Sequence, residues 1–246
     1  MHDEETGNRK QESGTGRKAL MNFLSPISFL LFPITFVTIR ILVTRMENQR
    51  TPSTSKPVLK GLVLAGGESI RMGSDKGLME YHGMPQREYL LGLLKGFTAE
   101  AYISCRPGQI NDSIIPVIED VYQDLGPFGG ILSAFKSDPD SAWLVVACDF
   151  PLLDHAAISQ LVEERDTSSI ATSFLDTHTL MPEPWITILE PKIYPILRDY
   201  HLRGRSSLRG ILVDFNSALI RAKDPNLLLN ANTPEEEAQI RMMISY

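Results

Sequence analysis

Two short runs that are apolar almost throughout constrain this chain more than any other feature. They are residues 58–65 and 142–147, and each is too short for a typical helix. A strand with one wet face would alternate apolar and polar residues, whereas a strand covered on both faces is apolar along its length. Segments with helical spacing lie between and after these runs. The pattern predicts an α/β domain with a mostly parallel sheet and helices on both faces.

The remaining elements follow the same alternation. We predict further strands at 101–104, 114–118, 170–175 and 185–189 and helices at 86–97, 129–136, 156–165, 191–200 and 206–213. A last helix begins at Thr233-Pro234-Glu235-Glu236, which has threonine as N-cap, proline at N1 and glutamate at N3. Asp154 is placed to cap the helix at 156–165.

The first 57 residues differ from the rest. Residues 1–18 are polar, and residues 19–43 are strongly apolar but contain Pro26 and Pro33. This stretch could be a membrane helix, a signal peptide, or a segment absent from the mature protein, with Met46 as the true start. We favour the third interpretation. The prediction is an N-terminal extension at 1–57, disordered or outside the mature protein, followed by one domain at 58–246.

Charge and cysteine content exclude several function classes. The chain has 30 acidic and 24 basic residues, a net charge of -6, so its charge does not indicate a nucleic-acid partner. Its two cysteines lie in separate segments and form neither a zinc motif nor a disulfide framework. This usage fits a reducing compartment and predicts a cytoplasmic protein.

The segment after the first strand has the composition of a phosphate-binding loop. It runs from Leu64 to Lys76 and leaves a strand end, where open α/β sheets bind ligands. Its glycines allow close approach of the backbone, and Ser69, Arg71 and Lys76 add donors and positive charge. Neither the dinucleotide-binding G-x-G-x-x-G nor the Walker pattern is present. The loop therefore predicts a polyphosphate site of another kind.

Two further motifs carry candidate polar residues. Asp120 follows a predicted strand, and Gly126-Pro127-Phe128-Gly129-Gly130 comes next, either to pass close to a nucleotide or to make a tight turn before a helix. Asp149 follows the second apolar run, at the same sheet edge as the first loop. An aspartate is the kind of hard oxygen ligand that magnesium uses beside substrate phosphates.

Together these motifs resemble the signature of the molybdenum cofactor guanylyltransferases. That family reads Leu-Ala-Gly-Gly, then Ser-x-Arg-Met-Gly, then Asp-Lys, and the similarity covers about residues 58–240. The resemblance implies a single Rossmann-like nucleotidyltransferase domain of the glycosyltransferase-A-like α/β fold. It further implies magnesium-dependent transfer of GMP from GTP to the phosphate of molybdopterin, with release of pyrophosphate.

The resemblance also assigns roles to individual residues. The implied GTP-binding residues are Leu64, Ala65, Gly66, Gly67, Lys76, Asp120 and Asp149. The implied catalytic residues are Arg71, Lys76 and Asp149, of which Asp149 would hold Mg2+. We expect Asn230, Asn232 and Arg205 at the acceptor. The arginines at 198, 203, 205 and 209 could meet an anionic pterin phosphate or form a solvated helix face, and we favour the second interpretation.

Some alternatives stay open. The cytidylyl relatives begin this loop with Leu-Ala-Ala-Gly, so Gly66 favours guanine, but a cytidylyltransferase or an enzyme with another phosphorylated acceptor remains possible. A non-catalytic nucleotide-binding module is the other alternative. We expect GTP and molybdopterin as partners, a possible molybdopterin-delivering protein, no nucleic acid, and no membrane for the catalytic domain.

Overall fold

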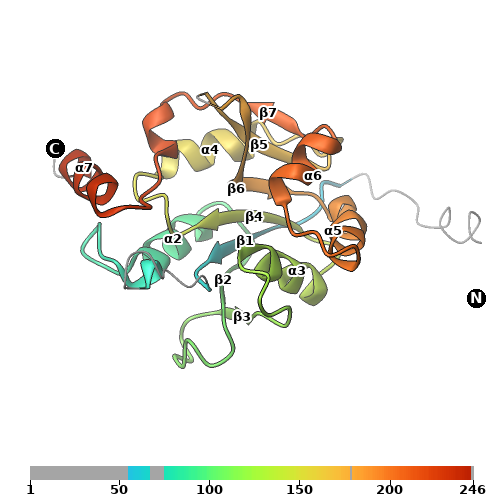
Figure 1. The fold of residues 1–246 in the computed structure, drawn as a ribbon, viewed down its shortest axis with the longest axis horizontal. Helices are drawn as coiled ribbons and strands as arrows, with labels where there is room; N and C mark the ends of the chain where they lie inside the picture. Colours follow the sequence, from blue (N-terminus) through green and yellow to red (C-terminus); the bar gives the residue numbers. More distant parts are fainter. Residues whose placement is uncertain (1–54, 67–74, 178, 245–246) are drawn as a thin grey trace, which may run out of the picture. The chain divides into compact units, whose positions relative to one another are not determined.

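A computed structural model describes residues 55–66, 75–177 and 179–244 of the chain. Within these residues one sheet has the strand order β3-β2-β1-β4-β6-β5-β7 (Figure 1). Its strands are β1 (Leu59–Leu64), β2 (Ala101–Cys105), β3 (Val117–Glu119), β4 (Ala142–Ala147), β5 (Ala171–Asp176), β6 (Met181–Leu189) and β7 (Ala218–Ile220). The two apolar runs, β1 and β4, are neighbours in this sheet.

The pairing directions confirm the mostly parallel sheet. Strand β1 pairs in parallel with β2 and β4, β2 with β3, and β5 with β7. Only β6 runs against its neighbours β4 and β5 among the described strands. The carboxyl ends of β1, β2 and β4 therefore meet at one edge of the sheet.

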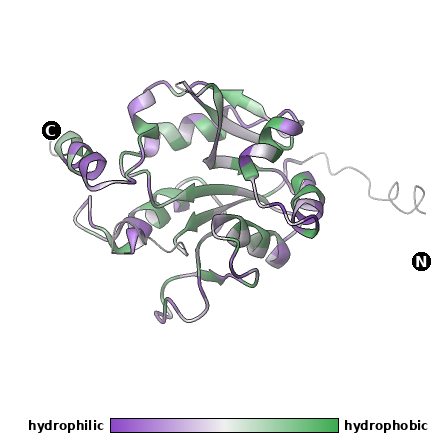
Figure 2. Ribbon diagram, in the orientation of Figure 1, coloured by the Kyte–Doolittle hydropathy of each residue, from purple (hydrophilic) through white to green (hydrophobic). Residues whose placement is uncertain are grey.

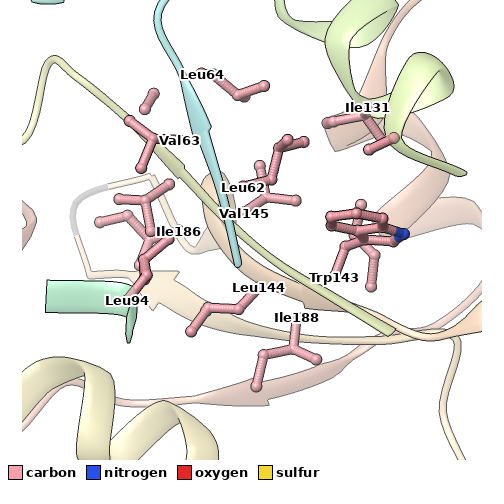
Figure 3. Packing of buried hydrophobic residues seen from close by; sticks show 14 of the residues in the cluster. Leu62, Val63, Leu64, Leu94, Ile131, Trp143, Leu144, Val145, Ile186 and Ile188 are labelled. Carbon is pink, nitrogen blue, oxygen red and sulfur yellow. The ribbon is translucent and has the colours of Figure 1, made fainter. Parts of the chain in front are cut away.

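Opposite faces of β1 are covered by α2 (Gln86–Lys95) and α3 (Pro127–Ser137). A Cβ built on Gly61 would lie 3.0 Å from the Leu94 Cβ of α2, whereas the Leu64 side chain reaches Gly130 of α3. Because positions 61 and 64 differ by an odd number, their side chains point to opposite faces of the strand. Figure 3 shows Leu94 and Ile131 on the two sides of β1.

The core is built from the strands that the pattern identified as buried. Leu62, Val63, Leu144 and Val145 have no exposed surface, and Trp143 is also buried. Figure 2 shows these central strands as hydrophobic, while the covering helices mix hydrophobic and hydrophilic residues. Both faces of the central strands are therefore buried, and the ends of these strands form the polar edge of the sheet.

The remaining helices follow the predicted starts closely. They are α4 (His155–Glu163), α5 (Tyr194–Leu202), α6 (Leu208–Asp214) and α7 (Pro234–Ile244), with 3-10 turns η1 (Lys76–Leu78), η2 (Pro191–Ile193) and η3 (Pro225–Leu228). Asp154 caps α4 by accepting from the Ala157 N–H at 2.9 Å. Thr233 accepts from the Glu236 N–H at 3.2 Å, and the Glu236 side chain accepts from the Thr233 N–H at 3.1 Å. Both predicted caps are confirmed.

Three strands differ from their predicted positions. The strand predicted at 114–118 begins only after Pro116, which lacks the N–H a strand ladder needs, and Ile114 is 87% exposed. Strand β6 starts four residues earlier than predicted, at Met181. Its prolines at 182 and 184 lie beyond the stretch paired with β4, so no bond to β4 is lost. Strand β7 was not predicted, because three residues carry too little periodicity.

The N-terminal prediction lies almost wholly outside the described residues. Residues 1–54 are not described, so the proposed extension and the start at Met46 stay predictions. Residues from Ser55 onward belong to one compact unit. In the described part of the chain, no helix has both the length and the apolar character needed to cross a bilayer.

Candidate active site

A pocket of about 110 Å³ lies at the carboxyl ends of β1 and β4. It brings together six of the residues predicted to bind the nucleotide: Leu64, Ala65, Gly66, Lys76, Asp120 and Asp149. Parallel strands place their carboxyl ends at one edge, so motifs far apart in sequence converge there. Gly67 and Arg71 lie outside the described residues, and their predicted roles stay predictions.

One side of the pocket is formed by a buried carboxylate at the end of β3. Ser104 Oγ donates to Asp120 Oδ1 at 2.6 Å, which fixes the carboxylate. Burial raises the Asp120 pKa, and the Ser104 hydrogen bond offsets part of that rise. A Cβ built on Gly66 would lie 2.9 Å from Asp120 Oδ2, so the backbone of the first loop passes directly over this group. Asp120 can thus present a fixed acceptor to a ligand lying along Gly66.

Glycine is needed at position 66 because a side chain would collide with Asp120, and not because the backbone adopts a conformation that other residues avoid. Its φ lies outside the left-handed region, where glycine would be favoured for conformational reasons. The glycines that open α3 have a related role. A Cβ at Gly129 would collide with the Tyr122 carbonyl, and one at Gly130 would collide with Ser104 Oγ. These two glycines let α3 pack tightly against the chain beside Asp120.

Lys76 lines the pocket, and both it and the preceding Asp75 are bound by side chains from distant segments. Asp75 precedes it and accepts from the Gly77 N–H and from Gln109 Nε2, both at 2.9 Å. Lys76 Nζ itself donates to Asn232 Oδ1 at 2.8 Å. The ammonium is therefore positioned by the segment just before α7, 156 residues away in sequence.

Asp149 lies two residues after the end of β4 and presents a carboxylate that is partly unsatisfied within the described residues. Its Oδ1 is buried and has no hydrogen-bond partner among the residues that the structure describes. Burial raises the pKa of the Asp149 carboxyl, and the Lys76 ammonium lowers it by less than burial raises it. Leaving such a group unpaired costs stability, so it is a candidate ligand for a cation. Asp149 also holds the segment just before α7, because its carbonyl accepts from the Ala231 N–H at 2.8 Å.

The loop after Asp149 is held by side chains that sequence reasoning missed. His82 Nε2 contacts the Pro151 carbonyl at 2.8 Å and must donate a proton to it. Gln86 Nε2 and the Tyr89 hydroxyl donate to the carbonyls of Phe150 and Leu153 at 3.3 and 3.2 Å. The His82 and Tyr89 rings stack with centroids 3.8 Å apart. No sequence motif signals these contacts, because their partners are backbone atoms.

The residues predicted to bind the acceptor are not brought to one place. Asn232 reaches Lys76, whereas Asn230 is exposed and does not line the pocket. Arg205 is also exposed, with its guanidinium 5.8 Å from the Tyr200 ring centroid. Of these three residues, Asn232 alone touches a residue that lines the pocket.

The described residues offer neither a cluster of metal ligands nor an exposed, reactive cysteine. Within the described ranges, no three His, Cys, Asp or Glu side chains gather closely enough to hold a metal ion. A cation at Asp149 would thus take its other ligands from a substrate and water, as magnesium often does. Both cysteines are free and buried, and burial raises the pKa of Cys148, so that its thiol stays protonated.

Comparison with known families identifies this arrangement. The family model of the MobA-like NTP transferase domain matches residues 61–218. The chain belongs to the MobA-like NTP transferase family. The matched range runs from β1 to the start of β7 and includes the pocket residues Leu64, Lys76, Asp120 and Asp149. The protein is therefore a nucleotidyltransferase.

Curated members of the family are similar over most of the domain. The molybdenum cofactor guanylyltransferase of Yersinia pestis (strain Pestoides F) is 30% identical over 187 residues, which cover 74% of this chain and 94% of that protein. The Pseudomonas entomophila enzyme of the same name is 29% identical over 192 residues, covering 74% and 98%. A molybdenum cofactor biosynthesis bifunctional protein of Synechocystis is 30% identical over 189 residues, and the match spans 54% of that protein's length.

Solved structures confirm the fold. Molybdopterin-guanine dinucleotide biosynthesis protein A from Archaeoglobus fulgidus superposes with a TM-score of 0.63 at 20% identity, covering 76% of this chain and 98% of that one. The 2-C-methyl-D-erythritol 4-phosphate cytidylyltransferase of Thermus thermophilus superposes with a TM-score of 0.58 at 13% identity, covering 76% and 98%. The predicted nucleotidyltransferase fold is confirmed, although the fold alone does not distinguish a guanylyl from a cytidylyl donor.

Proposed function

We propose that this protein transfers GMP from GTP to the phosphate of molybdopterin, in a reaction that depends on magnesium and releases pyrophosphate. The names of the curated relatives support the donor and the acceptor. The observation that carries the proposal is the buried, unpartnered Oδ1 of Asp149 in the same pocket as Lys76. A carboxylate and an ammonium at one strand edge suit a phosphate group bound through a cation.

The chemistry asks the protein mainly to position groups and balance charge. An oxygen of the acceptor phosphate attacks the α-phosphorus of GTP, and the bond to the β-phosphate oxygen breaks as pyrophosphate leaves. The acceptor is already an anion, so no general base is required. Lys76, held by Asn232, stabilises charge on the phosphates. We extend the same role to Arg71.

The residues present fit a magnesium ion at one point. Asp149 would hold it, because its buried oxygen lacks a partner and its charge is costly without a cation. When bound, the ion supplies charge neutralisation for the phosphates. The substrate supplies the remaining oxygen ligands, in keeping with the absence of a three-residue metal cluster among the described residues.

Guanine selectivity rests on the contact between Gly66 and Asp120. The carboxylate is fixed by Ser104, and the missing side chain at Gly66 lets that carboxylate lie against the first loop, where we propose that it meets the purine. A site built to hydrogen-bond one base rejects another that leaves its polar groups unpaired. We therefore expect GTP to be preferred over CTP and ATP by at least about a hundredfold, or about 2.7 kcal/mol.

The test is a matched set of reactions with the purified protein. GTP, CTP and ATP are each incubated with magnesium, with and without molybdopterin, and pyrophosphate and the dinucleotide product are measured. GTP-dependent pyrophosphate release that requires molybdopterin supports the proposal. Turnover with CTP at the same rate would replace it with a cytidylyltransferase. Nucleotide binding without turnover on any acceptor would favour the non-catalytic module.

The surroundings of the reaction follow from its substrates. We place the enzyme in the cytoplasm, where GTP is available and its two free cysteines stay reduced. A protein that delivers molybdopterin is a proposed partner, and pull-down of this chain from a molybdopterin-producing cell tests for it.

A further inference from the structure

Glu183 of β6 and Arg209 of α6 form an ion pair, and β6 flanks β4 on the side away from β1. Strands β4 and β6 are antiparallel, with pairs running from Trp143↔Leu189 to Val146↔Ile186. Asp149 comes three residues after the last paired residue of β4, and Glu183 comes three residues before its partner on β6, so the antiparallel pairing brings both to the same edge of the sheet. An electrostatic interaction between these two carboxylates agrees with that placement.

Glu183 is buried and forms an ion pair with Arg209, which in the sequence is one member of a cluster of four arginines. One carboxylate oxygen, Oε1, accepts from the Trp185 N–H at 3.1 Å. The other, Oε2, lies 3.6 Å from Arg209 Nη2, and the Glu183 side chain is 10% exposed. This separation makes an ion pair but is too long for a good hydrogen bond. Glu183 orients the guanidinium without using up its donors.

Arg209 keeps its hydrogen-bonding capacity available. It lies in the first turn of α6, and its side chain is 41% exposed. Its Nε is buried and finds no hydrogen-bond partner in the described part of the chain. A guanidinium has five N–H donors in a planar fork that matches phosphate oxygens. The exposed part of the side chain leaves a route for a ligand to approach these donors.

The other arginines of this region do not share that position. Arg203 is 68% exposed and pairs with Asp199 at 3.0 Å on its own helix. Arg198 and Arg205 lie over the rings of Tyr194 and Tyr200. The four arginines that were predicted as either an anion site or a solvated helix face therefore have different surroundings. Arg209 is the one among them that pairs with Glu183.

The position matches the geometry of the transfer. The nucleotide pocket is lined from the ends of β1 and β4, whereas β6 flanks β4 on its opposite side. In an in-line displacement the entering and leaving oxygens lie on opposite sides of the phosphorus. With the donor on the β1 side of Asp149, the acceptor would approach from the β6 side. An anionic acceptor on that side would be repelled by the carboxylates of Asp149 and Glu183, so a cation is needed to bind it there.

We propose that Arg209, oriented by Glu183, binds the anionic phosphate of the acceptor on the β6 side of Asp149. Arg209 is then an acceptor-binding residue, and Glu183 is a positioning residue that acts through it. This inference rests on the proposed function, since it needs a phosphorylated acceptor.

The test varies the charge at position 209 and separates donor from acceptor. Arg209→Gln removes the charge, Arg209→Lys retains it, and Arg203→Gln removes a matched exposed charge. We expect Arg209→Gln to raise the KM for molybdopterin at least about tenfold while the Kd for GTP stays within about twofold. Arg209→Lys should recover part of the loss, and Arg203→Gln should resemble the wild type. Glu183→Gln should raise the acceptor KM severalfold, again without altering GTP binding.

Two results overturn the inference in distinguishable ways. An active wild type and an Arg209→Gln variant with unchanged acceptor KM would remove Arg209 from the acceptor site and leave the proposed function standing. An equal loss of GTP and acceptor affinity would make the residue structural. Direct binding of molybdopterin, followed by its own fluorescence, covers the case of an inactive wild type. There, binding that weakens at least tenfold in Arg209→Gln supports the inference, and no binding to the wild type overturns both proposals.

Discussion

Replacing Gly66 with alanine tests the nucleotide side of the pocket most directly. The new Cβ would lie 2.9 Å from Asp120 Oδ2, closer than such atoms normally approach. The other neighbours, the Arg106 nitrogen and the Cys105 Cα, are 3.6 Å away and cause no strain. The substitution therefore acts on one carboxylate, which must move or bear the strain.

The size of the effect follows from how Asp120 is held. Its Oδ1 accepts from Ser104 Oγ at 2.6 Å, so the carboxylate cannot turn aside without weakening that bond. A hydrogen bond to a charged group is worth about 1.5–3 kcal/mol. We expect the free energy of unfolding to fall by up to that amount. If Asp120 contacts the nucleotide, the affinity for GTP should fall by about ten- to a hundredfold.

The assay is calorimetric titration of GTP and CTP, together with urea unfolding of the unliganded protein. GTP binding should weaken while CTP binding changes little, so the preference for GTP shrinks. Gly92→Ala is the matched control, because a Cβ there meets nothing within 4 Å. Gly92 lies exposed in the middle of α2, and alanine should leave GTP binding unchanged and add up to about 1 kcal/mol of stability.

A double-variant cycle identifies the cause. In an Asp120→Ala background the methyl group no longer meets the carboxylate, so Gly66→Ala should cost no further GTP affinity. A loss that persists in that background would place the steric conflict elsewhere. Wild-type stability and GTP affinity in Gly66→Ala itself would contradict the role of Asp120 at the nucleotide.

Three further predictions concern groups around the pocket and the core. Asp149→Asn should lower turnover at least about a hundredfold, since it removes the charge that would hold the metal; normal turnover would exclude that role. Burial raises the Asp149 pKa in the folded state above its unfolded value, so its ionisation costs stability as pH rises through the folded pKa. In EDTA, Asp149→Asn should therefore melt above the wild type at neutral pH, with the gap closing as pH falls towards about 4, the ordinary range of an aspartate; a gap that does not depend on pH would contradict the sign. Lys76→Ala should weaken GTP binding and slow single-turnover chemistry, whereas Lys95→Ala, at an exposed position of α2, should do neither. Arg165→Ala breaks a buried pair with Glu190 at 2.7 Å and should cost about 3–5 kcal/mol in urea unfolding with no change in nucleotide preference; a loss below about 1 kcal/mol would show that the pair contributes little.

Local sequence was sufficient wherever one strand or one cap carried its own signal. The run of β4 is apolar at all six positions, and the strand occupies the predicted residues. Asp154 and Thr233 have the side chains that helix starts require, and both caps form. Because parallel strands share one carboxyl edge, the prediction also brought Leu64 and Asp149 to one pocket.

Tertiary structure decided what depends on contacts between distant segments. The hydrogen bond from Lys76 to Asn232 joins residues 156 apart, and His82 and Gln86 bind backbone carbonyls more than sixty residues away. Every residue has a backbone carbonyl, so a hydrogen bond to one requires no particular residue type and cannot be predicted from a sequence motif.

The direction of β6 is the clearest case of this division. The residues of β6 suit a parallel or an antiparallel strand equally well, since side chains alternate in the same way in both. Only the antiparallel pairing with β4 brings the start of β6, with Glu183, to the sheet edge at which Asp149 lies. The amino acids indicated six of the seven described strands and the sheet edge at which we propose that the nucleotide binds. The direction of β6, which long-range packing sets, decided which charged residues lie on the β6 side of that edge.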